Sequence, residues 1–399
     1  MLGYAAAMTV ATRLDPLPDL PHGSERRFGL DLLRAVAILL VMLSHYANNL
    51  SAWFHLPPPY RLFFAGDLGV ELFFALSGFL IGRILLQIAE RGPTPHDLGV
   101  FLVRRWMRTL PLYFLWLGVL FLCFPPSAHV ADHAWRFATL TQNLLQPMPS
   151  DYFFAVSWSL TVEEWFYLLF SIAFLGTTWL LRRVGAALLL CLAVFMLGPL
   201  ALRMALLGFD PVSLDRSKEV FFRIDEIAYG VATAWLFARR SIIFRYPLLP
   251  LLAGLALIAS VWSGHPPLPG WLWPSLTYNL TVIGCALCLP AALRLRSAAA
   301  WFAAPVRRLS AQSYALYLMH VTVMFDLVQN QLWGPGHLAP LPSAAIAIAG
   351  PFLLSALSFR WFEAPILRLR PTERRKVTSG GAAPGASAAP SILEGSGIR

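Results

Sequence analysis

Apolar runs close to 20 residues long recur along the whole chain, and they restrict the fold more than any other feature. A helix of about 20 residues crosses the hydrocarbon core of a bilayer and satisfies its own backbone hydrogen bonds there. Only 13% of the residues are charged, against about 25% in typical soluble domains, and the mean hydropathy is +0.62. The pattern predicts an all-α fold, a polytopic integral membrane bundle of about ten transmembrane helices. The expected spans are 29–50, 66–89, 106–125, 157–181, 185–207, 220–238, 246–262, 274–293, 309–331 and 343–367.

The net charge of +10 comes from short arginine clusters between the apolar runs. The positive-inside rule places such clusters in the cytoplasm. An even number of spans then puts both termini there, and the outer loops 263–273 and 332–342 contain no charged residue. Topology therefore explains the charge, and no nucleic-acid partner is expected. The clusters are Arg26-Arg27, Arg104-Arg105-Arg108, Arg182-Arg183, Arg239-Arg240-Arg245, Arg307-Arg308 and Arg368 to Lys376.

The chain divides into three expected parts: a cytoplasmic N-terminal segment at 1–27, a membrane domain at 28–370 and a tail at 371–399. The tail is rich in Gly, Ala, Ser and Pro, a composition typical of disorder. The first 27 residues contain no convincing signal peptide, so the first span is expected to serve as an uncleaved anchor. Cys285 and Cys288 form a C-x-x-C without a second ligand pair. They are interpreted as small core residues, and no metal site is expected.

The first span, GLDLLRAVAILLVMLSHY, carries Arg34 and His45. Eleven helical steps bring the two side chains within about 20° of one direction, about 16 Å apart along the axis. Cationic side chains are costly inside a membrane, so this face is expected to meet the protein interior or a wet cavity. Imidazole titrates near neutral pH, which makes His45 the best candidate for a general base. An interfacial histidine that only completes a hydrogen bond is the alternative.

The fourth span begins SWSLTVEEWFY and places Ser159 and Glu163 four residues apart on one helix face. In the expected topology this face lies in the outer half of the bundle, at about the depth of His45. The Glu163 carboxylate could orient the imidazole and stabilise its protonated form. Glu164 points about 100° away and is expected to be structural. The alternative for Ser159 and Glu163 is a helix cap whose acidic residue favours the helix dipole.

The run FLVRRWMRTLPLY at 101–113 places Arg105 and Arg108 on one helical face at the cytoplasmic mouth of the third span. Guanidinium groups at this spacing suit phosphate. Topological charge in contact with lipid headgroups is the alternative.

Further charged residues are expected at the outer ends of the second and sixth spans. Glu71 lies in GDLGVELFFALSGFL, and Arg223 and Asp225 lie in FFRIDEIAYG, which is expected at the outer surface. Together with Ser159, these residues are candidates for binding an acceptor or supporting the site. Local ion pairing is the alternative. His320, in SYALYLMH, is expected near the middle of the membrane.

In this order the motifs resemble the membrane-bound acyltransferase family 3, whose members O-acylate polysaccharides, lipids and some macrolides. The resemblance covers about residues 28–366. The matching pairs are Arg34 and His45 for the family's arginine–ten residues–histidine signature, Arg105 and Arg108 for its R-x-x-R, and Ser159 and Glu163 for its S-x-x-x-E, with Glu71 where the family more often has aspartate.

The resemblance implies an acyl-CoA co-substrate, commonly acetyl-CoA, entering from the cytoplasm, with no bound cofactor. Arg105 and Arg108 would hold the CoA headgroup, and Arg34 would position the donor. His45 would take the proton of the acceptor hydroxyl while Glu163 supports the imidazole. The expected acceptor is a glycan, such as cell-surface polysaccharide or a lipid-linked glycan, and the expected place is a bacterial inner membrane with its lipids. A lipid or small-molecule hydroxyl is the alternative acceptor.

A membrane transporter is the rival from another class of protein. Transporters often carry paired, Gly/Pro-broken spans with charge near the midplane. Here the distinctive charges lie towards the span ends, and no such pairing is evident in the sequence.

Overall fold

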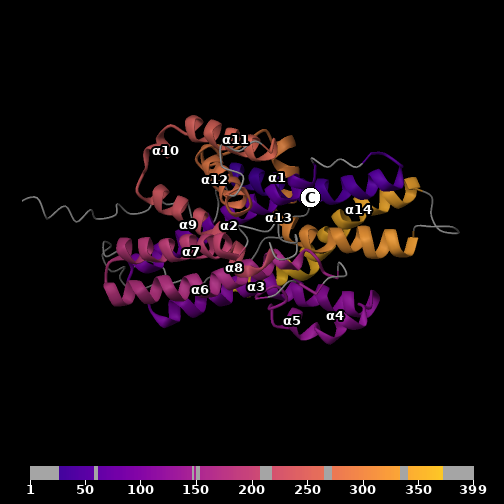
Figure 1. Ribbon diagram of the computed structural model, residues 1–399, viewed down its shortest axis with the longest axis horizontal. Coiled ribbons are helices and arrows are strands. Elements are labelled where there is room, and N and C mark those ends of the chain that lie inside the picture. The colour runs from indigo at the N-terminus through magenta and orange to yellow at the C-terminus, as the bar shows by residue number, and fades with distance from the viewer. Residues whose placement is uncertain are drawn as a thin grey trace, which may run out of the picture.

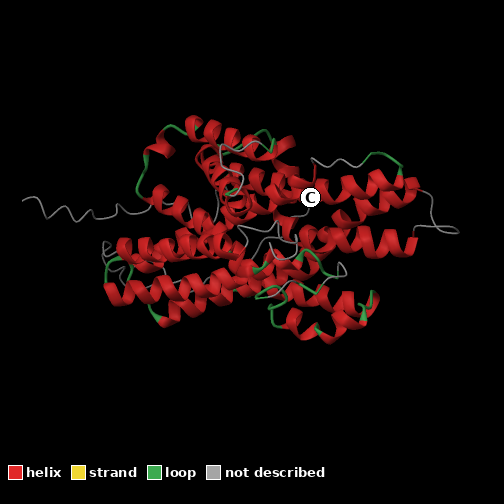
Figure 2. Cartoon of the chain, in the orientation of Figure 1, coloured by secondary structure: helices red, strands yellow, loops and turns green. Residues whose placement is uncertain are grey.

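The computed structural model describes residues 27–57, 62–145, 148–149, 153–206, 218–264, 272–332 and 340–371. Every regular element within these ranges is helical (Figure 2), so the predicted all-α class is confirmed for the described part of the chain. Apart from Arg27 and Pro371, the predicted N-terminal segment 1–27 and tail 371–399 lie outside the described residues.

Each of the ten expected spans corresponds to a helix or to consecutive helices (Figure 1). They are α1 (Phe28–Trp53), α2 (Phe63–Glu90), α3 (Pro95–Cys123), α6 (Ser157–Leu181), α7 (Val184–Leu206), α8 (Val220–Arg223) with α9 (Asp225–Ala238), α11 (Leu248–Trp262), α12 (Trp273–Arg294), α13 (Ala300–Val321) with the π-helix η3 (Thr322–Leu332), and α14 (Pro340–Ser358) with η4 (Phe359–Glu363) and α15 (Ala364–Arg368). Three short helices, α4 (Ala128–Asp132), α5 (Ala134–Ala138) and α10 (Ile242–Arg245), lie in connections.

Seven helices in the described ranges are long and apolar enough to cross a membrane, which confirms a polytopic membrane protein. The apolar helix α11 is shorter than these seven. The helix α13 is more polar because Ser310, Ser313 and His320 are buried within the bundle. A span that other helices surround can carry polar side chains that a lipid-facing span cannot.

The third span begins earlier than expected, at Pro95 rather than near residue 106. Thr94 caps the helix by accepting from the Asp97 backbone N–H, while the Asp97 carboxylate accepts from Thr94 in return, a capping box followed by proline at the first turn. Arg105 and Arg108 therefore lie within α3 and not in front of it.

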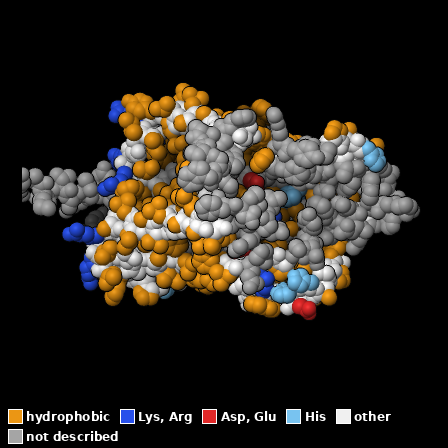
Figure 3. Space-filling view, in the orientation of Figure 1, with side chains coloured by type: hydrophobic (Ala, Val, Ile, Leu, Met, Phe, Trp, Pro, Cys, Tyr) orange, Lys and Arg blue, Asp and Glu red, His pale blue; other side chains and the backbone are white. Residues whose placement is uncertain are grey.

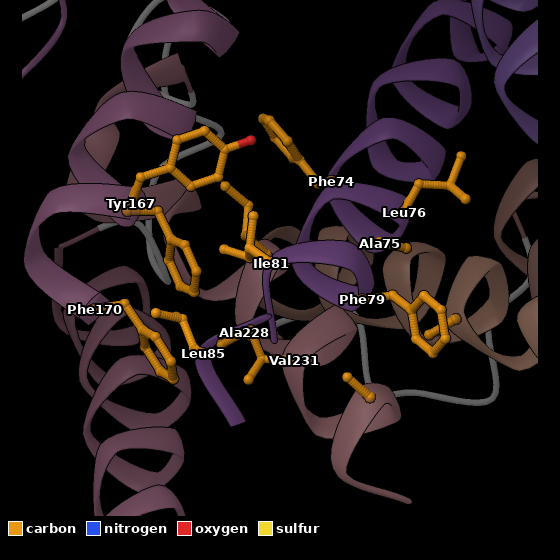
Figure 4. Packing of buried hydrophobic residues seen from close by; sticks show 14 of the residues in the cluster. Phe74, Ala75, Leu76, Phe79, Ile81, Leu85, Tyr167, Phe170, Ala228 and Val231 are labelled. Atoms are coloured by element: carbon orange, nitrogen blue, oxygen red, sulfur yellow. The ribbon is translucent and has the colours of Figure 1, made fainter. Parts of the chain in front are cut away.

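The core is built on α2, which packs closely against α9. A Cβ added at Gly78 would lie 2.0 Å from the Ile227 carbonyl oxygen, so only glycine permits this approach. Figure 4 shows Leu85 of α2 beside Phe170 of α6, with Ala228 of α9 nearby. This packing fixes α6, α2 and α9 relative to one another.

The connection that contains α4 and α5 folds back against the bundle below α13 in Figure 1. Tyr113 of α3 donates to the Phe137 carbonyl oxygen at 2.9 Å, and Trp165 of α6 donates to that of Leu140 at 2.8 Å. Arg136 donates to the Gln142 carbonyl oxygen at 2.7 Å, and burial lowers the pKa of this arginine. These bonds attach the connection to α3 and α6.

Charge is segregated along the molecule. In Figure 3 most of the visible Lys and Arg side chains gather at the left end, and the visible histidines lie towards the opposite end. Hydrophobic side chains cover much of the surface between them.

Candidate active site

A cavity of about 130 Å³ lies inside the bundle, lined by residues of α1, α2, α3, α6 and α13. Aromatic and aliphatic side chains such as Phe73 and Phe74 form much of its wall. The cavity brings together five of the residues predicted from the sequence, which are Arg34, Arg105, Arg108, Ser159 and Glu163. Charged groups from separate helices therefore converge on one space inside an otherwise apolar bundle.

A second cavity, of about 310 Å³, adjoins the first and shares Arg34, Arg108 and Tyr314 with it. Arg34 Nη1 lies 3.9 Å from Asp31 Oδ1, which in turn accepts a 2.6 Å hydrogen bond from Ser310. This chain of contacts holds the Arg34 guanidinium at the boundary between the two cavities. A ligand that extends through both would pass Arg34 and Arg108.

The arginines of α3 lie against the end of the last span. Arg104 donates to the Pro371 carbonyl oxygen, which brings the residues after α15 beside α3. Burial, followed by the positive charges of Arg108, Arg105 and Arg104, lowers the pKa of Arg370 to about 10. Among the described residues, no carboxylate lies within salt-bridge distance of Arg108. Clustered guanidinium groups suit a polyanionic ligand.

The Glu163 carboxylate faces the first cavity and is held by neighbouring hydroxyl groups. Tyr167 donates to Glu163 Oε1 at 2.9 Å, and the Ser77 hydroxyl lies 2.5 Å from the Tyr167 oxygen. Because the Tyr167 hydroxyl donates its hydrogen bond to the Glu163 carboxylate, its oxygen accepts a hydrogen bond from the Ser77 hydroxyl. Glu164 instead accepts from Thr109 of α3 at 2.6 Å, a contact that joins two helices, as expected for a structural residue.

Ser159 does not act as a cap for α6. The residue before the helix is Val156, with no capping side chain, and Ser159 lies inside the first turn. Its hydroxyl lies 2.6 Å from the Tyr317 hydroxyl of α13, and both residues line the first cavity. The capping alternative for Ser159 is therefore wrong.

His45 is half-buried on α1, outside the lining of either cavity. Its Nδ1 lies 3.0 Å from the Val41 carbonyl oxygen and 3.2 Å from His320 Nε2. His320 is also near Tyr317, with 6.0 Å between ring centroids. His45 is thus linked to the Tyr317 side of the cavity through His320. The described hydrogen bonds of His45 and of Glu163 go to different partners, so direct support of the imidazole by Glu163 stays a prediction.

His320 was given no role by the sequence reasoning, which noted it only as a histidine in the membrane. In the structure, His320 Nε2 lies within hydrogen-bonding distance of His45 Nδ1. The two histidines are 275 residues apart in the chain, so their contact depends on how α1 packs against α13. In the sequence, His320 stands out only as the last residue of the motif SYALYLMH.

Glu71, Arg223 and Asp225 form part of a buried ionic network, so their side chains are not exposed at an outer surface as expected, and the alternative of ion pairing is confirmed for them. Arg223 Nη2 lies 2.6 Å from Glu71 Oε1, and Arg203 Nη2 lies 2.5 Å from Asp225 Oδ2. These four side chains are at most 1% exposed because opposite charges neutralise one another inside the bundle. Arg223 also lies 3.7 Å from the ring centroid of Tyr278. None of the four lines either cavity, so their geometry fits a supporting role.

The four cysteines are free, and Cys285 and Cys288 are buried, as small core residues would be. Within the described ranges, no cluster of three or more potential metal ligands was found.

Comparison with known proteins gives one family match. The family model described as "Acyltransferase domain" matches residues 27–360. Peptidoglycan O-acetyltransferase OatA of Listeria monocytogenes is 27% identical over 383 residues, covering 84% of this chain and 55% of that protein. O-acetyltransferase OatA of Staphylococcus aureus is 27% identical over 371 residues, covering 85% of this chain and 57% of that protein. Nodulation protein 10 of Rhizobium leguminosarum bv. viciae is 26% identical over 378 residues, covering 88% of this chain and 96% of that protein.

The chain thus spans a little over half the length of the two OatA proteins. No solved structure matches it.

Proposed function

This chain belongs to the acyltransferase family 3 of membrane proteins, and we propose that it transfers an acyl group, acetyl in the first instance, from acyl-CoA to a hydroxyl of a glycan. The family membership sets aside the transporter alternative. A glycan acceptor is supported by the likeness to peptidoglycan O-acetyltransferase OatA.

One observation carries the proposal: two adjoining cavities run from the arginines of α3 to the Ser159 and Tyr317 hydroxyls, and Tyr317 neighbours His320, which contacts His45. Its two cavities meet at Arg34 and Arg108. A CoA thioester has a charged nucleotide at one end and its reactive carbon at the other, joined by a thin pantetheine arm. Arginines at one end of a narrow, mainly apolar passage suit that distribution of charge.

In the proposed reaction, His45 accepts the proton of the acceptor hydroxyl, and the hydroxyl oxygen attacks the thioester carbonyl carbon. The carbon–sulfur bond breaks, the acyl group forms an ester with the acceptor, and the proton passes from the imidazolium to the departing CoA sulfur. Arg34, between the two cavities, positions the donor. Glu163, held by Tyr167 on the same helix as Ser159, supplies the negative charge that stabilises the imidazolium.

We place the arginine-rich end of the molecule in the cytoplasm of a bacterium, with both termini on that side of the inner membrane. The donor then enters from the cytoplasm at α3, and the acceptor reaches His45 from the outer side. This sidedness and the donor's identity as acetyl-CoA rest on the charge distribution and the family.

The experiment is transfer of label from radiolabelled acetyl-CoA by the protein purified in lipid nanodiscs, with peptidoglycan fragments, polysaccharide and lipid extract as separate acceptors. We compare the wild type with His45→Ala and Arg108→Gln, and use His129→Ala and Arg245→Gln as controls at exposed positions. We expect label on a glycan with the wild type and both controls, at least about 10²-fold slower transfer with His45→Ala, and a raised KM with Arg108→Gln.

Wild-type rates from His45→Ala would refute the role of that residue. Labelling of the lipid fraction alone would replace the glycan by a lipid acceptor. If the wild type neither transfers label nor binds CoA, the proposal that acyl-CoA is the donor is refuted.

A further inference from the structure

The contact between His45 and His320 fixes where each ring carries its proton. His320 is fully buried in the last turn of α13. Its Nδ1 lies 3.0 Å from the Leu316 carbonyl oxygen and 2.9 Å from that of Tyr317, while its Nε2 faces His45 Nδ1 at 3.2 Å. Carbonyl oxygens only accept hydrogen bonds, so the N–H of His320 is on Nδ1.

A neutral imidazole has one N–H, which leaves His320 Nε2 as an acceptor. His45 Nδ1 therefore faces two acceptors, this nitrogen and the Val41 carbonyl oxygen at 3.0 Å. A proton on His45 Nδ1 can donate to these acceptors. An unprotonated Nδ1 would instead face the lone pairs of two acceptors with its own lone pair, which is repulsive. The neutral His45 ring then has its basic lone pair on Nε2.

We propose that His320 is a positioning residue that holds His45 in the Nδ1–H tautomer, so that Nε2 is the atom that takes the acceptor's proton. The inference rests on the proposed acyl transfer and adds the residue that orients its base. It gives His320 the orienting task that the sequence analysis assigned to Glu163, and leaves Glu163 the task of stabilising the imidazolium.

The proton balance of the step needs no further group. When Nε2 takes the hydroxyl proton, His45 becomes an imidazolium whose Nδ1–H still donates to His320 Nε2. When Nε2 releases that proton to the CoA sulfur, both rings return to their starting tautomers. A carboxylate performs this orienting task in the serine hydrolases. A neutral imidazole performs it here without placing another charge in the membrane interior.

The surroundings of His320 favour this neutral arrangement. The Tyr46 ring meets it edge-on, with centroids 6.3 Å apart. Apolar side chains of the cluster around Leu316, Met324 and Ala347 pack close by. This wall keeps the ring in one orientation, which is what a residue that selects a tautomer requires.

The test compares His320→Gln with His320→Leu. The glutamine amide oxygen can accept from His45 Nδ1, whereas leucine fills similar space without an acceptor. We expect His320→Leu to lower kcat by about 10²- to 10⁴-fold with the KM for acetyl-CoA unchanged, and His320→Gln to keep kcat within about tenfold of the wild type. Equal losses in both variants, or a raised KM with kcat unchanged, would overturn the assignment.

A second measurement does not depend on turnover. Nitrogen-15 NMR of histidine-labelled protein distinguishes a protonated ring nitrogen from a bare one, and the His45 signals are assigned by their loss in His45→Gln. We expect Nδ1–H and bare Nε2 at His45 in the wild type and in His320→Gln, and a mixture of tautomers in His320→Leu.

A proton on Nε2 of wild-type His45 would overturn the inference even if the enzyme is active. Conversely, the expected spectrum from a protein that transfers no acyl group would refute the proposed function and leave the tautomer assignment standing.

Discussion

Arg370 offers the sharpest test of where the donor binds, because its guanidinium lies among like charges. Its pKa is lowered to about 10 by burial and by Arg108, Arg105 and Arg104. Within the described residues, its Nε and Nη2 are buried without a hydrogen-bond acceptor. Buried donors crowded by like charge are satisfied by an anion that enters from outside. We therefore expect Arg370 to bind a phosphate of the donor alongside Arg108.

The magnitude follows from the contact that is lost. A hydrogen bond to a charged group contributes about 1.5–3 kcal/mol, and each 1.4 kcal/mol is a factor of ten in affinity. Arg370→Gln should therefore weaken CoA binding by about 10- to 100-fold. The matched control is Arg368→Gln, which removes the same charge from an exposed position two residues earlier. We expect that variant to bind CoA within about twofold of the wild type.

The pH dependence of binding supplies a second signature. The free protein keeps Arg370 charged below about pH 10, and phosphate stabilises the charged form, so binding raises this pKa again. CoA affinity should therefore fall as the pH rises through about 10 in the wild type, and this fall should be absent in Arg370→Gln. In the absence of CoA, the lowered pKa means that the positive charge of Arg370 lowers the free energy of unfolding at pH values below about 10. That cost declines as the pH rises towards the ordinary arginine value.

Isothermal titration with CoA between pH 8 and about 10.5 measures both effects, and CoA is used because a thioester hydrolyses at high pH. Wild-type affinity in Arg370→Gln, or an equal loss in Arg368→Gln, would contradict the direct contact and leave only a general effect of charge.

Two further predictions concern stability. Gly78→Ala should lower the thermal unfolding temperature in nanodiscs, because its Cβ would lie 2.0 Å from the Ile227 carbonyl oxygen, whereas Gly118→Ala has nothing within 4 Å and should be neutral or stabilising. Arg203→Met should cost about 3–5 kcal/mol by leaving the Asp225 carboxylate buried without its guanidinium partner, and a variant as stable as the wild type in denaturant unfolding would contradict the ionic role.

The sequence predicts the features that depend on the periodicity of a single helix. Runs of apolar residues located ten helical segments, seven of which are long and apolar enough to cross a membrane within the described ranges, and helical spacing put Ser159 and Glu163 on a face that lines the cavity. The start of α3 was missed, although Thr94, Pro95 and Asp97 form a capping box that the sequence contains.

Distances between helices were beyond that reasoning. Nothing in the spacing of one span indicates that His45 meets a histidine 275 residues away. The same limit applies to Arg223, which was expected at the surface because of its charge. Its buried partners, Glu71 and Glu226, could not be identified as such from the sequence.

The charges inside this bundle fall into two groups according to what neutralises them. Arg203 and Arg223 meet carboxylates at 2.5 and 2.6 Å, so the protein itself satisfies them, and the two pairs join α7 to α9 and α8 to α2. Among the described residues, no carboxylate lies within salt-bridge distance of Arg108, and Arg370 has buried N–H groups without a hydrogen-bond acceptor. Arg108 lies within the long apolar helix α3, where a charge without a counter-charge is costly. Arg108 lines both cavities, where a ligand that brings its own negative charge would neutralise it, and the proposed CoA thioester, with its phosphates at one end, would be such a ligand.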